Sequence, residues 1–318
     1  MTQDKVETLY KVLDQASQLL IDELDTAYFD ALIEVTQDLL SGTIQVEDGK
    51  PSQAVVKRLQ QLFAGVMISS LESETIRKAI GLALLRAAKI DKLQANHQLT
   101  PDMIGLIIGY LLNKLNKKPI NRLFDVTVGT GNLLGAVNAF LRQQNKQPQE
   151  LYGMDIDDTL LAMAGISFDL QQIPVNLFND DATQGNLPTA DAVISDLPLV
   201  HNQKSDQVDQ NLISASIDAV VEGGFAIYVV PSNLLEGNQA KDMLRLITAK
   251  TYLQGFLKLP DSVFKNSNAQ KAVLILQKQG GLAQQAKEVL IGQLPALKDT
   301  HALKSFFNDL DEWAKQLN

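Results

Sequence analysis

The sequence predicts an α/β protein: a doubly wound, mostly parallel sheet with an antiparallel hairpin at its end, preceded by an all-helical N-terminal domain. Three observations lead to this prediction. Apolar residues recur at helical spacing over roughly the first 100 residues. Short, almost wholly apolar runs then alternate with helical stretches, as in sheets that are buried on both faces. Two such runs, at 253–259 and 272–277, have no helix between them, so we expect them to pair antiparallel.

The composition indicates a globular intracellular protein. The chain has 318 residues, of which 45% are hydrophobic and 20% charged. It contains no cysteine and three histidines, so we expect neither a disulfide framework nor a metal site. The N-terminus is polar, and the longest apolar run, at 103–112, is about half of what a bilayer crossing needs. We therefore expect a cytoplasmic protein with no membrane segment.

The N-terminal region predicts helices that pack on one another. Apolar residues recur at helical spacing at 9–20 and 59–66. Residues 42–51 break this pattern with turn-forming residues and predict a loop or a small hairpin. A further helix is expected over 73–92, with Ser73 as its cap. Because the region has no chemical motif, we expect a helical domain that packs or that binds a partner protein, including a second copy of the chain.

The remainder predicts alternating strands and helices. We expect strands at 122–128, 151–156, 175–178, 192–195 and 225–230, the hairpin strands already given, a last strand at 289–294 and a helix at 303–317. Three domains are therefore predicted: a helical domain over residues 1–98, a sheet domain over 99–280, and a C-terminal strand and helix over 281–318 that pack on the sheet domain.

Ligands of open parallel sheets bind beyond the carboxyl ends of the strands, so the residues at those ends are the first candidates for a site. The first strand is followed by Asp125-Val126-Thr127-Val128-Gly129-Thr130-Gly131. Its two glycines permit a tight turn that a ligand can approach closely. A nicotinamide dinucleotide fingerprint needs a third glycine where this chain has Leu134, which disfavours a dehydrogenase.

The next two strands also end near acidic residues. Asp155 closes the second strand, and a carboxylate at that place can accept both hydroxyl groups of a ribose. Asp181 follows the third strand and offers an acceptor to an adenine amino group. Three acceptor-bearing loops in series are much more specific than any one of them.

The fourth strand ends in Ser195-Asp196-Leu197-Pro198-Leu199, which places an acceptor and a stiff backbone at the same edge. With Thr100-Pro101 before an apolar helix, the D-x-x-x-G-x-G turn, the Gly-Met-Asp strand end and Asp-Asp-Ala-Thr at 180–183, the sequence resembles class I S-adenosylmethionine-dependent methyltransferases. It resembles in particular the adenine-specific DNA methylases and the modification subunits of type I restriction systems, whose terminal hairpin is similar to residues 257–278. The whole chain looks most like the small stand-alone methylase-like proteins of Gram-positive bacteria.

The resemblance implies a sheet of the class I methyltransferase type and S-adenosyl-L-methionine as the cofactor. The cofactor-binding residues that it implies are Thr100, Pro101, Asp125, Thr127, Gly129, Gly131, Asp155, Ile156, Asp181 and Ala182. The catalytic segment that it implies is Asp196, Leu197, Pro198 and Leu199. In the family, the side-chain oxygen of the first of these residues and the next backbone carbonyl accept hydrogen bonds from an amino group, which directs its lone pair at the cofactor methyl group.

Two positions of the catalytic segment depart from the family pattern of Asn or Asp, two prolines and an aromatic residue. Leu197 replaces the first proline, and Leu199 replaces the ring on which a flipped base stacks. The sequence favours an adenine-specific N-methyltransferase that acts on DNA or RNA. Two alternatives stay open: methylation of a protein amide, and a catalytically degenerate module that binds the cofactor and acts through a partner.

The charge distribution bears on the nucleic-acid partner. The formal net charge is −9, the opposite of what a protein that grips phosphates usually carries. Basic residues nevertheless cluster at Lys114, Lys117, Lys118 and Arg122, and seven Lys or Arg stand against two Asp between Lys241 and Lys278. These clusters are either solvated surface or the places where DNA or RNA binds.

Overall fold

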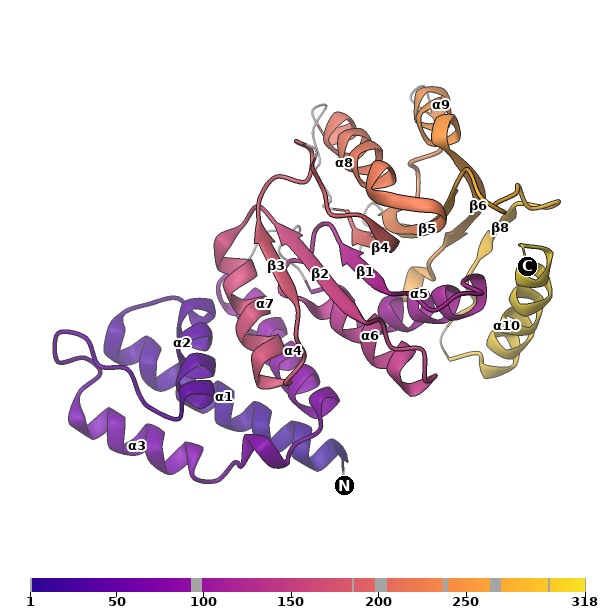
Figure 1. Cartoon of the computed structure of the whole chain (residues 1–318). Helices are drawn as coiled ribbons and strands as arrows, with labels where there is room; N and C mark the ends of the chain where they lie inside the picture. Colours follow the sequence, from indigo (N-terminus) through magenta and orange to yellow (C-terminus); the bar gives the residue numbers. More distant parts are fainter. Residues whose placement is uncertain are drawn as a thin grey trace.

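The computed structural model describes residues 2–92, 99–184, 186–197, 205–236, 240–263, 270–296 and 298–317. An eight-stranded sheet forms its centre, in the order β3-β2-β1-β4-β5-β7-β6-β8 (Figure 1). Its strands are β1 (Arg122–Asp125), β2 (Glu150–Asp155), β3 (Asn176–Asn179), β4 (Ala190–Asp196), β5 (Val220–Pro231), β6 (Thr251–Lys258), β7 (Lys271–Lys278) and β8 (Leu290–Gln293). Among these strands only β7 is antiparallel to its neighbours, β5 and β6, so the predicted hairpin is confirmed.

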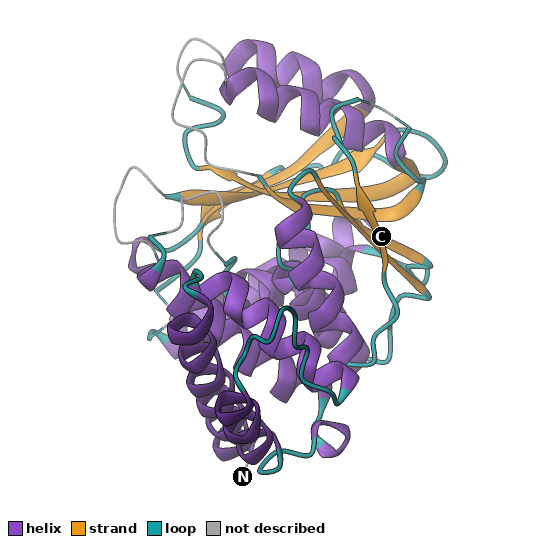
Figure 2. Ribbon diagram, turned by 90° about the vertical axis from the view of Figure 1, so that its left-hand side faces the viewer, coloured by secondary structure: helices purple, strands orange, loops and turns teal. Residues whose placement is uncertain are grey.

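Helices cover both faces of the sheet, which Figure 2 shows nearly edge-on. One face carries α5 (Asp102–Leu115), α6 (Asn132–Gln143), α7 (Asp158–Leu170) and α10 (Thr300–Ala314). The other face carries α8 (Ser205–Ala219) and α9 (Ala240–Lys250). This two-sided cover explains why the strands are apolar on nearly every residue, and it confirms the predicted doubly wound, mostly parallel fold.

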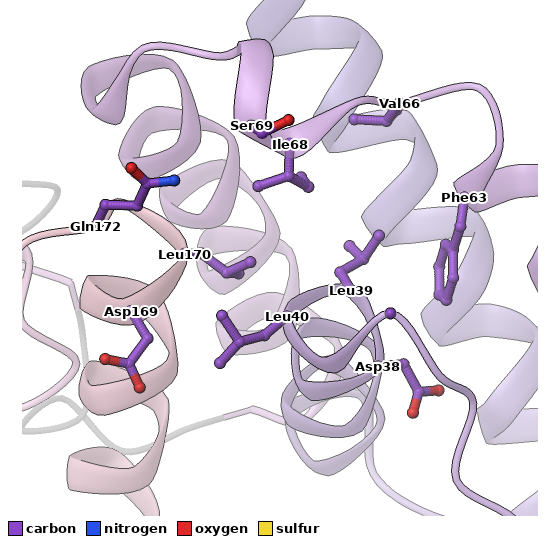
Figure 3. A pocket seen from close by; sticks show the side chains of 11 residues that line it. Asp38, Leu39, Leu40, Phe63, Val66, Ile68, Ser69, Asp169, Leu170 and Gln172 are labelled. Carbon is purple, nitrogen blue, oxygen red and sulfur yellow. The ribbon is translucent and has the colours of Figure 1, made fainter.

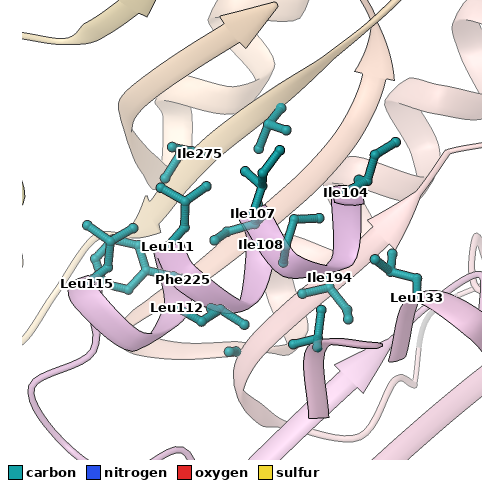
Figure 4. Packing of buried hydrophobic residues seen from close by; sticks show 14 of the residues in the cluster. Ile104, Ile107, Ile108, Leu111, Leu112, Leu115, Leu133, Ile194, Phe225 and Ile275 are labelled. Carbon is teal, nitrogen blue, oxygen red and sulfur yellow. The ribbon is translucent and has the colours of Figure 1, made fainter. Parts of the chain in front are cut away.

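Helix α5, which precedes β1 in the chain, packs on the sheet. This packing sets the position of the residues just before the helix. Its Ile and Leu side chains, spaced three or four residues apart from Ile104 to Leu115, are buried against residues of β4, β5 and β7 (Figure 4). Ile194, Phe225 and Ile275 are among the sheet residues in this cluster. The packing holds the start of α5, and with it Thr100 and Pro101, beside the carboxyl end of β4.

A separate core holds the N-terminal helices together. These are α1 (Thr2–Leu24), α2 (Tyr28–Ser41), α3 (Gln53–Phe63), the short 3-10 helix η1 (Ile68–Ser70) and α4 (Ser73–Ile90). Leu160, Met163, Ile166 and Leu170 of α7 belong to the same core, whereas Ala164 and Phe168 of α7 face the sheet. Helix α7 therefore belongs to both cores and joins the helical domain to the sheet, an arrangement that the periodicity of the sequence did not predict.

Two local predictions about the helical domain have different outcomes. Residues 42–51 form a loop closed by a single antiparallel bridge between Glu47 and Lys50, as the turn-forming residues indicate. The prediction that Ser73 caps α4 is wrong, because the helix begins at Ser73 itself and Glu72 occupies the cap position without a side-chain hydrogen bond.

The tail returns to the sheet. Strand β8 pairs parallel with β6 at the sheet edge, and two 3-10 turns, η3 (Asp261–Val263) and η5 (Lys315–Leu317), follow β6 and α10. Trp313 of α10 is buried and donates from Nε1 to the backbone oxygen of Glu288 at 2.9 Å. The aromatic residue thus anchors the last helix, as the predicted amphipathic pattern requires.

Candidate cofactor and acceptor site

The glycine turn after β1 is held by neighbouring strands and by close packing. Val128 N donates to Met154 O of β2 at 2.8 Å. Gly129 and Gly131 have φ values of 52° and 84°, in the left-handed region that favours glycine. A Cβ atom at Gly131 would lie 2.6 Å from Cε2 of Phe168 in α7, so no larger residue fits there without a shift. Both glycines therefore serve the turn, and Gly131 also permits the close approach of α7.

Asp125 lies at the centre of this edge and is fully buried. Its Oδ1 accepts a hydrogen bond from Thr127 N at 3.2 Å, while Oδ2 has no hydrogen-bond partner among the described residues. Burial, together with the negative charges of Asp155 and Asp196, holds the pKa of Asp125 well above its ordinary value, and the hydrogen bond from Thr127 N opposes this rise only in part. A buried carboxyl oxygen without a partner suits a ligand that brings a cationic or donor group.

Asp155 ends β2 beside the glycine turn. Its Oδ2 accepts from Gly129 N at 2.7 Å and its Oδ1 accepts from Asp157 N at 3.0 Å. Burial raises the pKa of Asp155, and these backbone donors oppose that rise. The next residue, Ile156, lies between β2 and α7 and is 72% exposed, which is a high exposure for a large aliphatic side chain. The pair presents an acceptor and an apolar surface at the same edge.

Both carboxyl oxygens of Asp181 accept hydrogen bonds from residues of its own loop. Its Oδ1 accepts from both N and Oγ1 of Thr183, at 2.9 and 2.7 Å, and its Oδ2 accepts from Gln184 Nε2 at 3.1 Å. The hydroxyl of Thr183 is the main cause of the lowered pKa of Asp181. Ala182 is buried in the core on the α8 and α9 face. An adenine amino group would therefore share Asp181 with donors that already bind it.

Asp196 lies where β4 ends, and both of its carboxyl oxygens have partners. Thr100 Oγ1 donates to Oδ2 at 2.7 Å, and the ammonium group of Lys271 forms an ion pair with Oδ1. The same ammonium group lies 3.5 Å from the backbone oxygen of Leu197. Thr127 Oγ1 shares a hydrogen bond of 2.5 Å with Ser195 Oγ, which links the β1 turn to this segment. Pro198 and Leu199 lie outside the described residues.

Thr100 and Pro101 are positioned through the helical domain. Asn132, the first residue of α6, donates from Nδ2 to the Thr100 backbone oxygen at 2.6 Å. The guanidinium group of Arg77 in α4 donates to Asn132 Oδ1 at 2.6 Å and to both oxygens of Asp102, at 2.8 and 2.9 Å. Arg77 is 5% exposed. One buried side chain of the N-terminal domain thus holds both the segment before α5 and the helix that follows the glycine turn.

The structure therefore brings together Thr100, Asp125, Thr127, Gly129, Asp155 and Asp196 through the hydrogen bonds just given. Sequence reasoning missed Arg77, Asn132 and Lys271 as parts of this cluster. The place of Lys271 could be predicted in part. Lys271 is the first residue of β7, which runs antiparallel to β5, and the start of an antiparallel strand lies at the sheet edge where its neighbour ends. No sequence signal singles out Arg77, because its partners in the site, Asp102 and Asn132, are 25 and 55 residues away.

The basic residues that the sequence offered as a nucleic-acid surface are mostly paired with acidic residues. Ion pairs join Lys114 to Asp311, Arg122 to Glu150, Lys250 to Asp218, Lys258 to Glu236, Lys271 to Asp196 and Lys278 to Asp218. Lys117 and Lys118 are exposed. Lys250 and Lys278 share the carboxylate of Asp218. These pairs balance part of the positive charge of the two clusters, which leaves less of it for phosphate groups than the sequence pattern suggested.

A separate cavity of about 420 Å³ lies between the helical domain and the end of α7 (Figure 3). It is lined by apolar residues of α2, α3, η1 and α7, together with Asp38, Ser69, Asp169 and Gln172. Those predicted cofactor and catalytic residues that the structure describes do not contribute to this lining. Within the part of the chain that is described, no helix is long and apolar enough to span a membrane, and no cluster of potential ligands could hold a metal ion.

An effect of pH follows from the burial of Asp125. Because its pKa is higher in the folded chain, the folded state binds more protons than the unfolded state above about pH 4, and stability falls as the pH rises to the folded pKa. The Asp125→Asn variant should gain stability relative to wild type over this window, by about 1.4 kcal/mol per pH unit. Urea unfolding at several pH values measures this slope; a difference that does not change with pH would contradict the prediction.

Comparisons with known proteins identify the family of the chain. A family model of the YtxK N-terminal helical domain matches residues 7–88, and the model of the N-6 DNA Methylase family matches residues 84–309. The protein YtxK of Bacillus subtilis (strain 168) is 31% identical over 334 residues, covering 99% of each chain.

Solved structures share the fold. A candidate class I S-adenosylmethionine-dependent methyltransferase from Listeria monocytogenes has a TM-score of 0.89 at 28% identity, covering 98% of this chain and 99% of the other. The methyltransferase subunit of a type I restriction-modification system from Streptococcus thermophilus has a TM-score of 0.61 at 14% identity, covering 94% and 77%. Since the methylase model spans more than half of the sequence and YtxK matches nearly all of it, the chain belongs to the N-6 DNA methylase family and is a class I, adenine-type methylase-like protein.

Proposed function

We propose that this chain binds S-adenosyl-L-methionine at the carboxyl ends of β1, β2 and β3 and transfers its methyl group to an amino nitrogen, that of adenine in DNA or RNA. The observation that carries the proposal is the convergence of Asp125, Asp155 and Asp196 at one sheet edge, linked through the backbone and side-chain donors of the glycine turn. These are the positions that the family resemblance assigns to the cofactor and the acceptor.

The residues fit the cofactor by their chemistry. Asp125 has an unpartnered buried oxygen beside the turn, which suits the ammonium group of a methionine moiety. Asp155 accepts hydrogen bonds and lies next to the exposed Ile156, which suits a ribose and the adenine attached to it. Asp181 and Ala182 would hold the far side of the adenine, and Thr100 and Pro101 would close the site beside Asp196. When bound, the cofactor supplies a methyl group on a positively charged sulfur.

Asp196 and Leu197 would orient the acceptor. An amino group that donates one hydrogen to Asp196 Oδ1 and the other to Leu197 O has its lone pair directed away from both acceptors. The Leu197 backbone is held rigidly because its N–H donates to Val229 O of β5 at 2.9 Å and its side chain is buried. Such positioning is the main source of rate enhancement in an in-line transfer between two bound groups.

A non-catalytic module is the second candidate function, and one observation favours it. The acceptor atoms of Asp196 and Leu197 already have a donor in Lys271. If that contact were permanent, the chain would bind the cofactor without transferring its methyl group.

For either function we propose that the helical domain docks a partner protein or a second copy, since α4 exposes Leu82 and Leu85, at 41% and 54%. Methylation of a protein amide has no observation of its own in its favour.

The decisive experiment is calorimetric titration with S-adenosylmethionine and S-adenosylhomocysteine. We expect the wild-type chain to bind both and the Asp155→Ala variant to lose about tenfold or more in affinity, because a charged acceptor for the ribose is removed. Asp158→Ala serves as the control, since Asp158 is exposed at the start of α7 and its carboxylate contacts Thr159. Equal affinities in the two variants, or no binding by the folded wild-type chain, would contradict the proposed cofactor site.

A further inference from the structure

The ammonium group of Lys271 occupies the place that the proposed function gives to the acceptor amino group. It is bound to Asp196 Oδ1 and lies 3.5 Å from Leu197 O, the two atoms that would orient an incoming amine. Thr100 donates to the remaining oxygen, Asp196 Oδ2, at 2.7 Å. The acceptor atoms of this edge therefore have donors from within the chain.

This arrangement is built into the sheet. Lys271 is the first residue of β7 and lies opposite Pro231 in β5, while Asp196 at the end of β4 lies opposite Val229 in the same strand. The backbone oxygen of Lys271 accepts from Leu259 N at 2.9 Å, which fixes the start of β7. The side chains of Lys271 and Asp196 are only 12% and 15% exposed, so solvent screens their ion pair much less than one on the surface.

We propose that Lys271 is an internal occupant of the acceptor position that an adenine base must displace before its amino group can be methylated. The inference rests on the proposed function and adds a competitor for the acceptor atoms of the same site. A lysine side chain has four flexible carbons, so its ammonium group can leave while its backbone stays in the sheet.

The test compares two short single-stranded oligodeoxynucleotides that differ at one base. One contains adenine, and the other contains purine, which lacks the 6-amino group. Fluorescence anisotropy gives the affinity of each for wild type, Lys271→Met and Lys258→Met. Lys258 is the matched control because it lies on the adjacent strand β6 and pairs with Glu236 at the surface.

In Lys271→Met, Asp196 and Leu197 are free to accept from the base, so we expect it to prefer the adenine oligonucleotide by about tenfold. In wild type and Lys258→Met the preference should stay below about twofold, since the lysine competes for the same atoms. Equal affinities of Lys271→Met for the two oligonucleotides, or no binding of either, would overturn the inference. Cofactor binding is measured separately, so a failure of the proposed cofactor site is distinguishable from this outcome.

A second measurement uses the wild-type chain and covers the case in which Lys271→Met does not fold. Acetylation of Lys271 is followed by mass spectrometry with and without a saturating amount of the adenine oligonucleotide. Displacement of the ammonium group predicts a faster reaction at Lys271 and an unchanged rate at Lys258. An unchanged or slower rate at Lys271 with the oligonucleotide bound would overturn the proposal.

Discussion

The Arg77→Met variant should lose about 3 kcal/mol in the free energy of unfolding. Arg77 is buried and donates to Glu74, Asp102 and Asn132, and methionine of similar length supplies none of these hydrogen bonds. Glu74 and Asp102 would be left without their main cationic partner, which costs more than the bonds themselves contribute. Since both carboxylates are partly exposed, the loss should fall at the lower end of the range for broken buried ion pairs. Urea denaturation measures the difference.

The same substitution should weaken cofactor binding, because Asn132 and Thr100 lose the group that positions them. Arg86→Met is the matched control on the same helix: Arg86 is partly exposed and lies 3.5 Å from Asp14, so its removal should cost at most about 1 kcal/mol. Calorimetry with S-adenosylhomocysteine gives the affinities at a temperature where both variants are folded. An Arg77→Met variant with wild-type stability and affinity would show that the helical domain does not support the site.

Methyl transfer by the Asp196→Ala variant should fall by about 10²- to 10³-fold, the range found when one group that orients the transition state is removed. The affinity for S-adenosylhomocysteine should change little, because Asp196 faces the acceptor side of the edge. Asp196→Asn is the control, since its amide oxygen still accepts a hydrogen bond and the family pattern allows either residue. Radiolabelled methyl transfer to DNA, RNA and protein pools measures the rates.

Two outcomes would contradict the role of Asp196. Retained turnover in Asp196→Ala would show that another group orients the acceptor. An equal loss of cofactor affinity in Asp196→Ala and Asp155→Ala would place Asp196 in the cofactor site. If the labelled methyl group appears in protein and resists nuclease, the acceptor is a protein amide and not a base. The proposed role of Asp196 would then stay the same.

The strand ends could be predicted from the sequence because the fold class settles their place. In a parallel sheet every strand ends at the same edge, so Asp125, Asp155 and Asp196 had to lie near one another once the buried strands were recognised. Asp157 could likewise be proposed as a cap, and its Oδ1 accepts from the N–H groups of Thr159 and Leu160 at the start of α7. The cap of α4 was missed because a serine one residue away from the cap gives the same local pattern.

The partners of those residues depend on the tertiary structure. Whether Lys271 reaches Asp196 depends on the order of β4, β5 and β7 and on their register, and a slip of one residue would turn the lysine to the other face of the sheet. Whether Arg77 supports Thr100 and Asn132 depends on how the helical domain docks on α7. Local periodicity was enough to predict the fold class and the residues at the sheet edge. It could not show which of those residues already have partners, because the partners come from segments distant in the chain.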